Sequence, residues 1–511
     1  MTSLRDLQPA FESTFTRAQT MQVAERLWQR DIHVFGQTDE TALQSIRTRL
    51  GWLDAPYQFE KRLAEIEQFA KEVVDRGFTS TVLLGMGGSS LCVEVIREVL
   101  GIKAGFPVLH VLDSTHPDQI AELEAQLDLA RTLFIVASKS GTTIESDSFY
   151  RYFWDKIAEV DRDHPGNHFI AITDPNTFLS KHSAEQMFLK TFENPSDIGG
   201  RFSALSYFGL VPAALMGVDM KKFMSRALEE ANSSKESTLD NPALTLGVVL
   251  ATAHEEGRNK VFITSSKQYQ SFVYWAEQLV AESTGKLGKG VLPVDATAAL
   301  DVNDGFTVSL VYGEETPAAS QVPGQEIRLR DEYDLAAQFF RWEFATAVCG
   351  ALLQINPFDE PNVTESKSNT SRVLTDLETL GSLPTLDAAS IQEIKDFAKE
   401  RVAENGYFAI LAYVARNAAS IEKLNALRDE IRNAINRPVT VGFGPRYLHS
   451  TGQLHKGGAK QGAFAIIIDE PQANVAIPTK AFNFNQLVRA QAIGDSQALA
   501  SKDLPVKVFT L

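Results

Sequence analysis

Short apolar runs alternate with longer amphipathic stretches over much of the chain. Between residues 80 and 175 four such runs lie at 82–84, 106–113, 132–137 and 168–174. They are rich in Val, Ile, Leu and Phe, and stretches with apolar residues at helical spacing separate them. This alternation is typical of βαβ units and predicts a parallel sheet.

A second cycle of the same kind begins after Asp240. It has apolar runs at 260–266 and 306–313 and helix-like stretches at 243–257, 270–286 and 331–355. The stretch 366–400 is predicted to be an irregular connection with one helix. The tail then adds apolar runs at 406–414 and 463–468, with a charged helix at 418–435 between them. We expect two α/β sheets in tandem, the second with a C-terminal elaboration.

The residues before the first run have a different pattern. Phe59, Leu63, Ile66 and Phe69 recur at helical spacing, with many charges between them. Residues 1–75 are therefore predicted to be a helical N-terminal extension. The two α/β units are expected at 76–240 and 241–511.

Composition and charge limit the class of partner. The 511 residues are 44% hydrophobic and 22% charged, with a net charge of −16. This charge disfavours nucleic acid and anionic membranes as partners, and an anionic ligand would need local basic groups. The longest uncharged apolar run, 344–355, is too short to span a bilayer, and the N-terminus lacks the apolar core of a signal peptide. We expect a cytoplasmic protein, with Cys92 and Cys349 as buried small hydrophobes.

Two loops at the ends of predicted strands could hold an anion. The first, GMGGSS at 85–90, precedes a helix, so glycines and unpaired N–H groups would meet a ligand there. Asp113 at the end of the next strand also permits a dinucleotide site, but the glycine spacing differs from G-x-G-x-x-G. The second loop, SKSGTT at 138–143, combines four hydroxyls, a glycine and a lysine. These groups suit a phosphomonoester, whereas ordinary helix N-caps are the alternative.

Two charged residues in unusual contexts could carry out chemistry. Arg201 follows a pair of glycines in SDIGGRFSALS, where a fixed guanidinium could stabilise an oxyanion; a surface arginine beside a turn is the alternative. Glu282 lies near the C-terminus of a predicted helix, where the helix dipole raises its proton affinity and suits a general base. A solvated glutamate before a glycine cap is the alternative there. His449 and His455 in YLHSTGQLHKGG lack the spacing of a zinc pair, so we predict no metal site.

These segments together resemble the phosphoglucose isomerase family, whose members are built from two sugar-isomerase (SIS) domains. GMGGSSL resembles the glycine loop of the first domain, and SKSGTTIES is similar to the phosphate-binding loop. DIGGRFSALS is similar to the arginine signature, and QLVAESTGK matches the segment with the base glutamate. INPFDEPNVTESK resembles the C-terminal signature that ends in a lysine. The fold implied is two tandem SIS-type, doubly wound, mainly parallel sheets flanked by helices.

The resemblance implies roles for individual residues. Ser138, Lys139, Ser140 and Thr143 would bind phosphate, and Gly88 and Ser89 would contact the sugar. Arg201 would stabilise the enediolate with Gln278 nearby, Glu282 would be the base, and Lys367 would assist ring opening. No metal or redox cofactor is implied.

Two departures from the family pattern stand out. Glu360 occupies the position where the family usually has Gln, and Pro361–Asn362 replace the usual following residues. No histidine lies between Glu282 and Lys367, where the family places its ring-opening histidine. LHSTGQ resembles the sequence around that histidine but follows Lys367, as in the isomerase half of bifunctional transaldolase–phosphoglucose isomerases. We therefore predict His449 for ring opening, with His455 as the lesser candidate.

The resulting hypothesis is reversible conversion of glucose 6-phosphate into fructose 6-phosphate through a cis-enediolate. In the family the histidine comes from the neighbouring subunit, so the resemblance implies a homodimer whose active site is completed by the partner. Three alternatives remain open: an isomerase that also accepts mannose 6-phosphate, a non-catalytic SIS-type sensor of sugar phosphates, and a dinucleotide-dependent enzyme.

Overall fold

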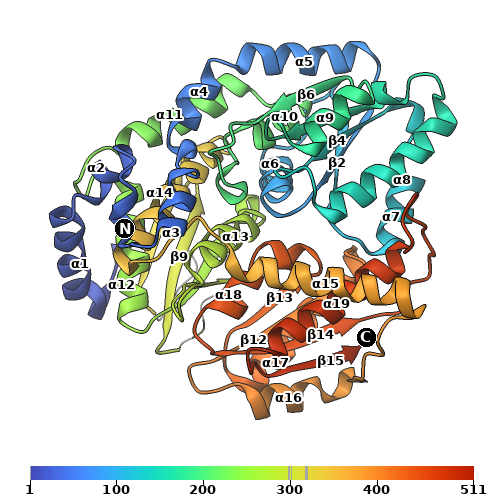
Figure 1. The fold of residues 1–511 in the computed structure, drawn as a ribbon. Coiled ribbons are helices and arrows are strands. Elements are labelled where there is room, and N and C mark those ends of the chain that lie inside the picture. Colours follow the sequence, from blue (N-terminus) through green and yellow to red (C-terminus); the bar gives the residue numbers. More distant parts are fainter. Residues whose placement is uncertain (1, 297–299, 301, 317–319, 321) are drawn as a thin grey trace.

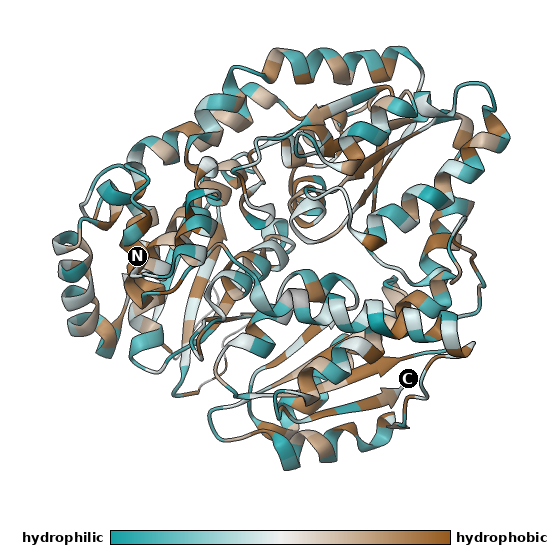
Figure 2. Cartoon of the chain, viewed as in Figure 1, coloured by the Kyte–Doolittle hydropathy of each residue, from teal (hydrophilic) through white to brown (hydrophobic). Residues whose placement is uncertain are grey.

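Three sheets of five strands form the framework of the protein (Figure 1). The computed structural model describes residues 2–296, 300, 302–316, 320 and 322–511. Within these residues no helix is long and apolar enough to cross a membrane. Brown apolar residues concentrate on the strands and on the inward faces of the helices, while teal residues cover the outside (Figure 2).

The first sheet follows the first alternating pattern of the sequence. Its strands are all parallel, in the order β3-β2-β4-β5-β6, and β4 (TLFIVA) is buried along its whole length. Helices must cover both faces of such a sheet, which explains the amphipathic stretches between the apolar runs. The strands are β2 (Ser80–Gly85), β3 (Val108–Leu112), β4 (Thr132–Ala137), β5 (Phe169–Thr173) and β6 (Lys190–Glu193); the helices are α6 (Leu91–Leu100), α7 (Pro117–Ala125), α8 (Ile144–Val160) and α9 (Phe178–Glu185).

The second sheet has the order β1-β10-β9-β7-β8 and is parallel except for β1, which pairs with β10 in the antiparallel sense. The helix α14 lies in the core, where its residues 334–340 and 342–353 are buried. The strands are β1 (Thr2–Ser3), β7 (Lys260–Ser265), β8 (Leu292–Asp295), β9 (Gly305–Tyr312) and β10 (Gly324–Leu329); the helices are α11 (Met220–Ser233), α12 (Pro242–Glu255), α13 (Phe272–Thr284) and α14 (Asp334–Leu353). α10 (Tyr207–Leu215) precedes them in the chain and packs on α6 of the first unit.

The N-terminal extension packs against the helices of these two units. α1 lies on α12, α2 on α14 and α5 on α10, so the extension shares their core. Its helices are α1 (Gln8–Thr20), α2 (Val23–Trp28), α3 (Glu40–Arg47), α4 (Ala55–Glu60) and α5 (Leu63–Asp75).

The C-terminal tail differs from the expected elaboration of the second sheet, because it forms a third sheet of its own. This sheet is parallel, in the order β11-β15-β14-β12-β13. Alternate residues of β12 and β14 belong to two separate apolar clusters, one on each face, so both faces need helices. The strands are β11 (Ala388–Ser390), β12 (Tyr407–Tyr413), β13 (Val439–Phe443), β14 (Gly462–Ile468) and β15 (Val506–Thr510); the helices are α15 (Pro361–Leu380), α16 (Ile394–Arg401), α17 (Ala418–Ile435), α18 (Gly452–Gly457) and α19 (Phe484–Ala500).

The α/β class with mainly parallel sheets is confirmed. The stretch 366–400 is more regular than predicted, because α15 covers most of its first half and α16 its end. α15 packs along α19, and its Val373, Leu374 and Leu377 join an apolar cluster of the first unit. The three units meet around α13, which contacts α6 of the first unit and α18 of the third (Figure 1).

Candidate active site

A cavity of about 620 Å³ opens where the three units meet. The structure gathers in its wall nearly every site residue predicted from the sequence, although they span positions 88 to 449. Those that line it are Gly88, Ser89, Lys139, Ser140, Thr143, Arg201, Gln278, Glu282, Lys367 and His449.

The glycine loop holds two other segments close to the cavity. A Cβ atom on Gly88 would lie 2.1 Å from the carbonyl oxygen of Gly200, next to Arg201. A Cβ atom on Gly87, whose φ is +53°, would lie 2.8 Å from the Cβ atom of His449. These glycines therefore allow the arginine segment and the histidine segment to meet at one loop.

The SKSGTT loop connects β4 to the N-terminus of α8. Ser140 and Thr143 face the cavity, whereas Ser138 is only 4% exposed and lies beneath the loop. The Ser138 hydroxyl lies 2.9 Å from the Thr143 hydroxyl and accepts a hydrogen bond from the amide of Gly141 at 3.1 Å. Ser138, which was predicted as a direct phosphate ligand, thus supports the loop and is not part of the cavity wall.

Lys139 points along the cavity wall but is already paired. Its ammonium group contacts the carboxylate of Asp174, at the end of β5, and donates to the carbonyl oxygen of Ser196 at 2.9 Å. Burial lowers the pKa of Lys139, against the opposing effect of Asp174. Asp174 therefore offsets much of the positive charge that the sequence assigned to this loop.

Arg201 is fixed from several sides and is only 5% exposed. Its Nη2 donates to the carbonyl oxygens of Pro357 at 2.7 Å and of Asp359 at 2.9 Å, and its Nε donates to the Ser283 hydroxyl at 2.8 Å. The remaining Nη1 lies 3.3 Å from Glu282 Oε1 and 3.2 Å from Glu360 Oε2. One edge of the guanidinium is thus held by the chain, and the other faces two carboxylates in the cavity.

Glu282 lies in the last turn of α13 and is 7% exposed. Gln278, one turn earlier, donates to Glu282 Oε2 at 3.2 Å and to the carbonyl oxygen of His449 at 2.6 Å. Burial raises the pKa of Glu282; Arg201 opposes the rise and Glu360 adds to it. Burial, and not only the helix dipole expected from the sequence, is therefore the main cause of the raised pKa of Glu282.

His449 belongs to the third unit, in the short helix η10 (Arg446–His449), and reaches the cavity within the same chain. This differs from the expectation that a neighbouring subunit supplies the histidine. Its Nε2 lies 3.1 Å from Glu145 Oε1, and Gln491 donates to the same oxygen at 2.8 Å. His455 is buried away from the cavity, 2.8 Å from the Tyr407 hydroxyl, and burial lowers its pKa to about 3.

Sequence reasoning missed Glu145 and Asp174. Glu145 is an acidic residue in the first turn of α8, a common position for stabilising a helix, and nothing local sets it apart. Its partner His449 is 304 positions away. Only the meeting of the first and third units reveals the pair.

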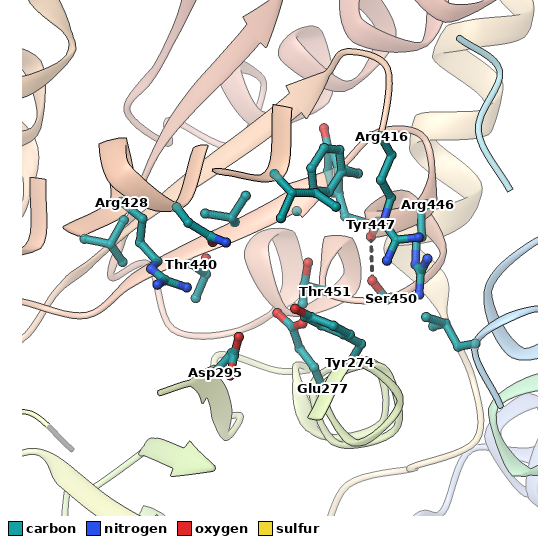
Figure 3. Close-up of a pocket in the computed structure, with 17 residues that line it drawn as sticks. Tyr274, Glu277, Asp295, Arg416, Arg428, Thr440, Arg446, Tyr447, Ser450 and Thr451 are labelled. Atoms are coloured by element: carbon teal, nitrogen blue, oxygen red, sulfur yellow. Dashed lines mark hydrogen bonds between the residues drawn. The ribbon is translucent and has the colours of Figure 1, made fainter. Parts of the chain in front are cut away.

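A second cavity, of about 90 Å³, is lined by neighbouring residues of α13 and of the His449 segment (Figure 3). Glu277 points into it from α13, across from Arg446 (Figure 3). Burial raises the pKa of Glu277 to about 8; nearby Asp295 adds to the rise and Arg446 opposes it.

The arginines on one side of this second cavity already have partners. Arg446 and Arg416 form ion pairs with Glu94 of α6, at 2.5 and 2.6 Å. Arg446 also lies 3.2 Å from Asp113. Although Glu94 is buried, the two arginines hold its pKa at about 2. This ion-pair network ties the His449 segment to the first unit.

Together these features define an α/β protein with a site for acid–base chemistry on a small anion. A loop of hydroxyls at a helix N-terminus can receive the anion. A buried carboxylate with a raised pKa can exchange a proton, and a fixed guanidinium can stabilise negative charge beside it.

The comparisons with known proteins identify the family. The family model for phosphoglucose isomerase matches residues 60–320, and the chain belongs to this family. The matched range includes the two loops, Arg201 and Glu282, whereas Lys367, His449 and the third sheet lie beyond it.

Individual relatives agree with the family match. The glucose-6-phosphate isomerase of Carboxydothermus hydrogenoformans is 31% identical over an aligned length of 279 residues, and the alignment covers 51% of this chain and 60% of that enzyme. The probable glucose-6-phosphate isomerase of Methanococcus maripaludis is 27% identical over an aligned length of 385 residues, and the alignment covers 65% of this chain and 86% of that protein.

Solved structures show a similar fold. A hypothetical protein from Thermus thermophilus matches with a TM-score of 0.62 and 22% identity, over 73% of this chain and 99% of its own. A glucose-6-phosphate isomerase from Chlamydia trachomatis matches with a TM-score of 0.57 and 14% identity, over 73% of this chain and 87% of its own.

Proposed function

We propose that this protein is a glucose-6-phosphate isomerase that interconverts glucose 6-phosphate and fructose 6-phosphate through a cis-enediolate. The observation that carries the proposal is the geometry around Arg201, whose Nη1 faces the buried Glu282 at 3.3 Å in the cavity that also contains the SKSGTT loop. Family membership and the named relatives support the same activity.

The SKSGTT loop binds the phosphate and so places the sugar carbons deeper in the cavity. Ser140, Thr143 and the N-terminus of α8 supply hydrogen-bond donors. Gly88 and Ser89, in the loop after the neighbouring strand β2, leave room for the sugar and contact its hydroxyls.

His449 and Lys367 open the sugar ring. The proton leaves the O1 hydroxyl, the C1–O5 bond breaks, C1 becomes a carbonyl and O5 gains a proton. Glu145 orients the imidazole through its contact with Nε2, and it stabilises the imidazolium when His449 carries the proton.

Glu282 then moves the proton between the two carbons. It removes the C2 proton, the electron pair forms the C1–C2 double bond, and O1 gains negative charge beside Arg201. A proton then passes from O2 to O1, the O2 electron pair forms the C2 carbonyl, and the electron pair of the C1–C2 double bond takes the proton back from Glu282 at C1, which gives the ketose. Acid–base transfer of this kind contributes about 10²–10⁴-fold, and a fixed cation beside the oxyanion contributes a further ~10²–10³-fold.

Glu360, at the position where the family usually has Gln, adds a negative charge beside Arg201 and Glu282. Its carboxylate shares Nη1 of Arg201 with Glu282 and adds to the rise in the pKa of Glu282. A base with a raised pKa is matched to proton transfer near neutral pH.

Two finer proposals accompany the activity. We also propose that the chain is related to the isomerase half of bifunctional transaldolase–phosphoglucose isomerases, which its LHSTGQLHKGG segment resembles. A cytoplasmic homodimer follows from the family resemblance; light scattering after size exclusion tests the dimer. Because His449 reaches the cavity within one chain, we expect turnover to be unaffected by dilution below the dimer dissociation constant.

A coupled assay tests the activity. Fructose 6-phosphate is supplied, and the glucose 6-phosphate formed is measured with an NADP-dependent glucose-6-phosphate dehydrogenase. We expect turnover that saturates with substrate. A parallel assay with mannose 6-phosphate distinguishes the broader isomerase, and binding of fructose 6-phosphate without turnover would support the sensor and contradict the proposal.

The His449→Ala variant tests the ring-opening step separately. We expect its rate to fall on cyclic glucose 6-phosphate, while C2 proton exchange is retained on erythrose 4-phosphate, which cannot close a ring because its O4 is phosphorylated. Equal losses on both compounds would remove His449 from ring opening.

A further inference from the structure

The N-terminal extension contributes to the wall of the active-site cavity. Thr48 and Arg49 line the cavity, just after α3, and lie outside the range matched by the family model. Leu50 forms an antiparallel bridge with Ile198, and the amide of Gly51 donates to the carbonyl oxygen of Asp197 at 2.9 Å. The backbone on the C-terminal side of Arg49 is therefore fixed against the loop that leads to Arg201.

The Arg49 side chain lies between the two ends of the cavity. Its stem passes Gly199, where an added Cβ atom would lie 3.5 Å from Arg49 Cδ. Its charge acts on Lys139 and Asp174 near the SKSGTT loop and on Glu360 near Arg201. The guanidinium is thus within electrostatic range of both the hydroxyl loop and the arginine–carboxylate group.

Among the described residues, Arg49 differs from Lys139 and Arg201 in having no carboxylate partner. Lys139 contacts Asp174, and Arg201 faces Glu282 and Glu360. In the described part of the chain, the hydrogen bond that the Arg49 guanidinium makes is to the carbonyl oxygen of its neighbour Thr48, at 3.2 Å, and no carboxylate lies within 4.0 Å of it.

The charge balance of the cavity depends on this residue. The wall has four cationic side chains (Arg49, Lys139, Arg201 and Lys367) and three acidic ones (Asp174, Glu282 and Glu360). Without Arg49 these charges would cancel. In a chain with a net charge of −16, a neutral cavity would give a phosphate dianion little electrostatic attraction.

We infer that Arg49 is a substrate-binding residue that holds the phosphate group of the sugar phosphate. A guanidinium presents paired N–H donors that match two phosphate oxygens, which Lys139 cannot do while it is bound to Asp174. This inference rests on the proposed function, since it assigns the cation for the same substrate. It also gives the N-terminal extension a part in the active site.

Kinetics and phosphate inhibition of three variants test the inference. Arg49→Met keeps the apolar stem and removes the charge. Arg49→Lys keeps a charge but removes the paired N–H donors of the guanidinium. Arg47→Ala is the control, because it removes an exposed arginine two positions away on α3. For Arg49→Met we expect KM for fructose 6-phosphate and the inhibition constant of inorganic phosphate to rise about tenfold or more, with kcat changed less than about threefold. Arg49→Lys should recover part of the loss, and Arg47→Ala should behave like the wild type.

Several outcomes would overturn the inference. Unchanged KM and unchanged phosphate inhibition in Arg49→Met would show that the residue does not hold phosphate. A fall in kcat at constant KM would place it in the chemical step instead. If Arg49→Met fails to fold, as judged by circular dichroism, the test rests on Arg49→Lys, because loss of the paired N–H donors should still weaken phosphate binding.

Failure of the proposed function would look different. Calorimetric titration with inorganic phosphate measures binding without turnover. If the wild type binds phosphate and Arg49→Met does not, but neither converts fructose 6-phosphate, then the phosphate site stands and the isomerase assignment falls. If the wild type is active and Arg49→Met binds phosphate equally well, then the isomerase assignment stands and the phosphate-binding role of Arg49 falls.

Discussion

The two cavities beside α13 contain similar residue types but differ in how their charges are paired. In the larger cavity, Nη1 of Arg201 is shared between Glu282 and Glu360, and Arg49 has no carboxylate within ion-pair distance among the described residues. In the smaller one, Arg446 and Arg416 are bound to Glu94. The arginines beside the smaller cavity are therefore neutralised by a carboxylate of the first unit, whereas the larger cavity keeps an arginine that can meet an anion. The ion pairs beside the smaller cavity instead anchor the His449 segment to the first unit.

The largest difference between the cavities should appear in activity. Glu282 and Glu277 lie less than two turns apart on α13; Glu282 is buried and Glu277 is half-buried, and both have raised pKa values. We expect Glu282→Gln to lower kcat by about 10³-fold or more while fructose 6-phosphate still binds. Glu277→Gln is the matched control and should keep kcat within about threefold. Equal losses in the two variants would remove the distinction between the cavities.

The ion-pair network of the smaller cavity should matter for stability. Glu94→Gln leaves the partly buried Arg416 without its carboxylate and the buried Arg446 with Asp113 alone, so we expect the free energy of unfolding to fall by about 3 kcal/mol in urea titrations. Glu98→Gln, on the exposed side of the same helix, should change it by less than ~0.5 kcal/mol. If Glu94→Gln is as stable as Glu98→Gln, the network does not anchor the His449 segment.

A smaller effect is expected in the pH dependence of stability. The pKa of Glu277 is about 8 in the folded protein, against an ordinary value of 4.5. Between these values the folded state keeps a proton that the unfolded state has released, so stability falls as pH rises from 4.5 to 8 and then levels off. We expect Glu277→Gln to match the wild type near pH 5 and to exceed it by about 1–3 kcal/mol near pH 8. Thermal melting across this range measures the difference, and parallel curves for the two proteins would contradict it.

The sequence predicts the parts of the site that lie close together along the chain. The two loops at strand ends, Arg201 after its glycines and Glu282 near a helix end each carry a local pattern, and the structure brings them into one cavity. The α/β class also follows from alternating runs. Local patterns are enough here because a strand, its loop and the next helix are neighbours in sequence.

Long-range contacts explain what the sequence leaves open. The runs at β12 and β14 are visible as strands, but no local pattern says whether they extend the second sheet or form a third. Glu145 meets His449 only through the packing of the first and third units, and Arg49 enters through a bridge between Leu50 and Ile198. Ser138 looks like its neighbours in sequence, and only its burial under the loop separates it from them.

Deuterium transfer tests most directly whether Glu282 carries the proton between C2 and C1. Glucose 6-phosphate labelled with deuterium at C2 is converted in ordinary water, and NMR follows the label in the first fructose 6-phosphate formed. Shuttling by one carboxylate predicts that part of the deuterium appears at C1 and the rest is lost to solvent, and that both processes stop in Glu282→Gln. Complete transfer to C1 with no loss to solvent, or unchanged transfer in Glu282→Gln, would contradict it.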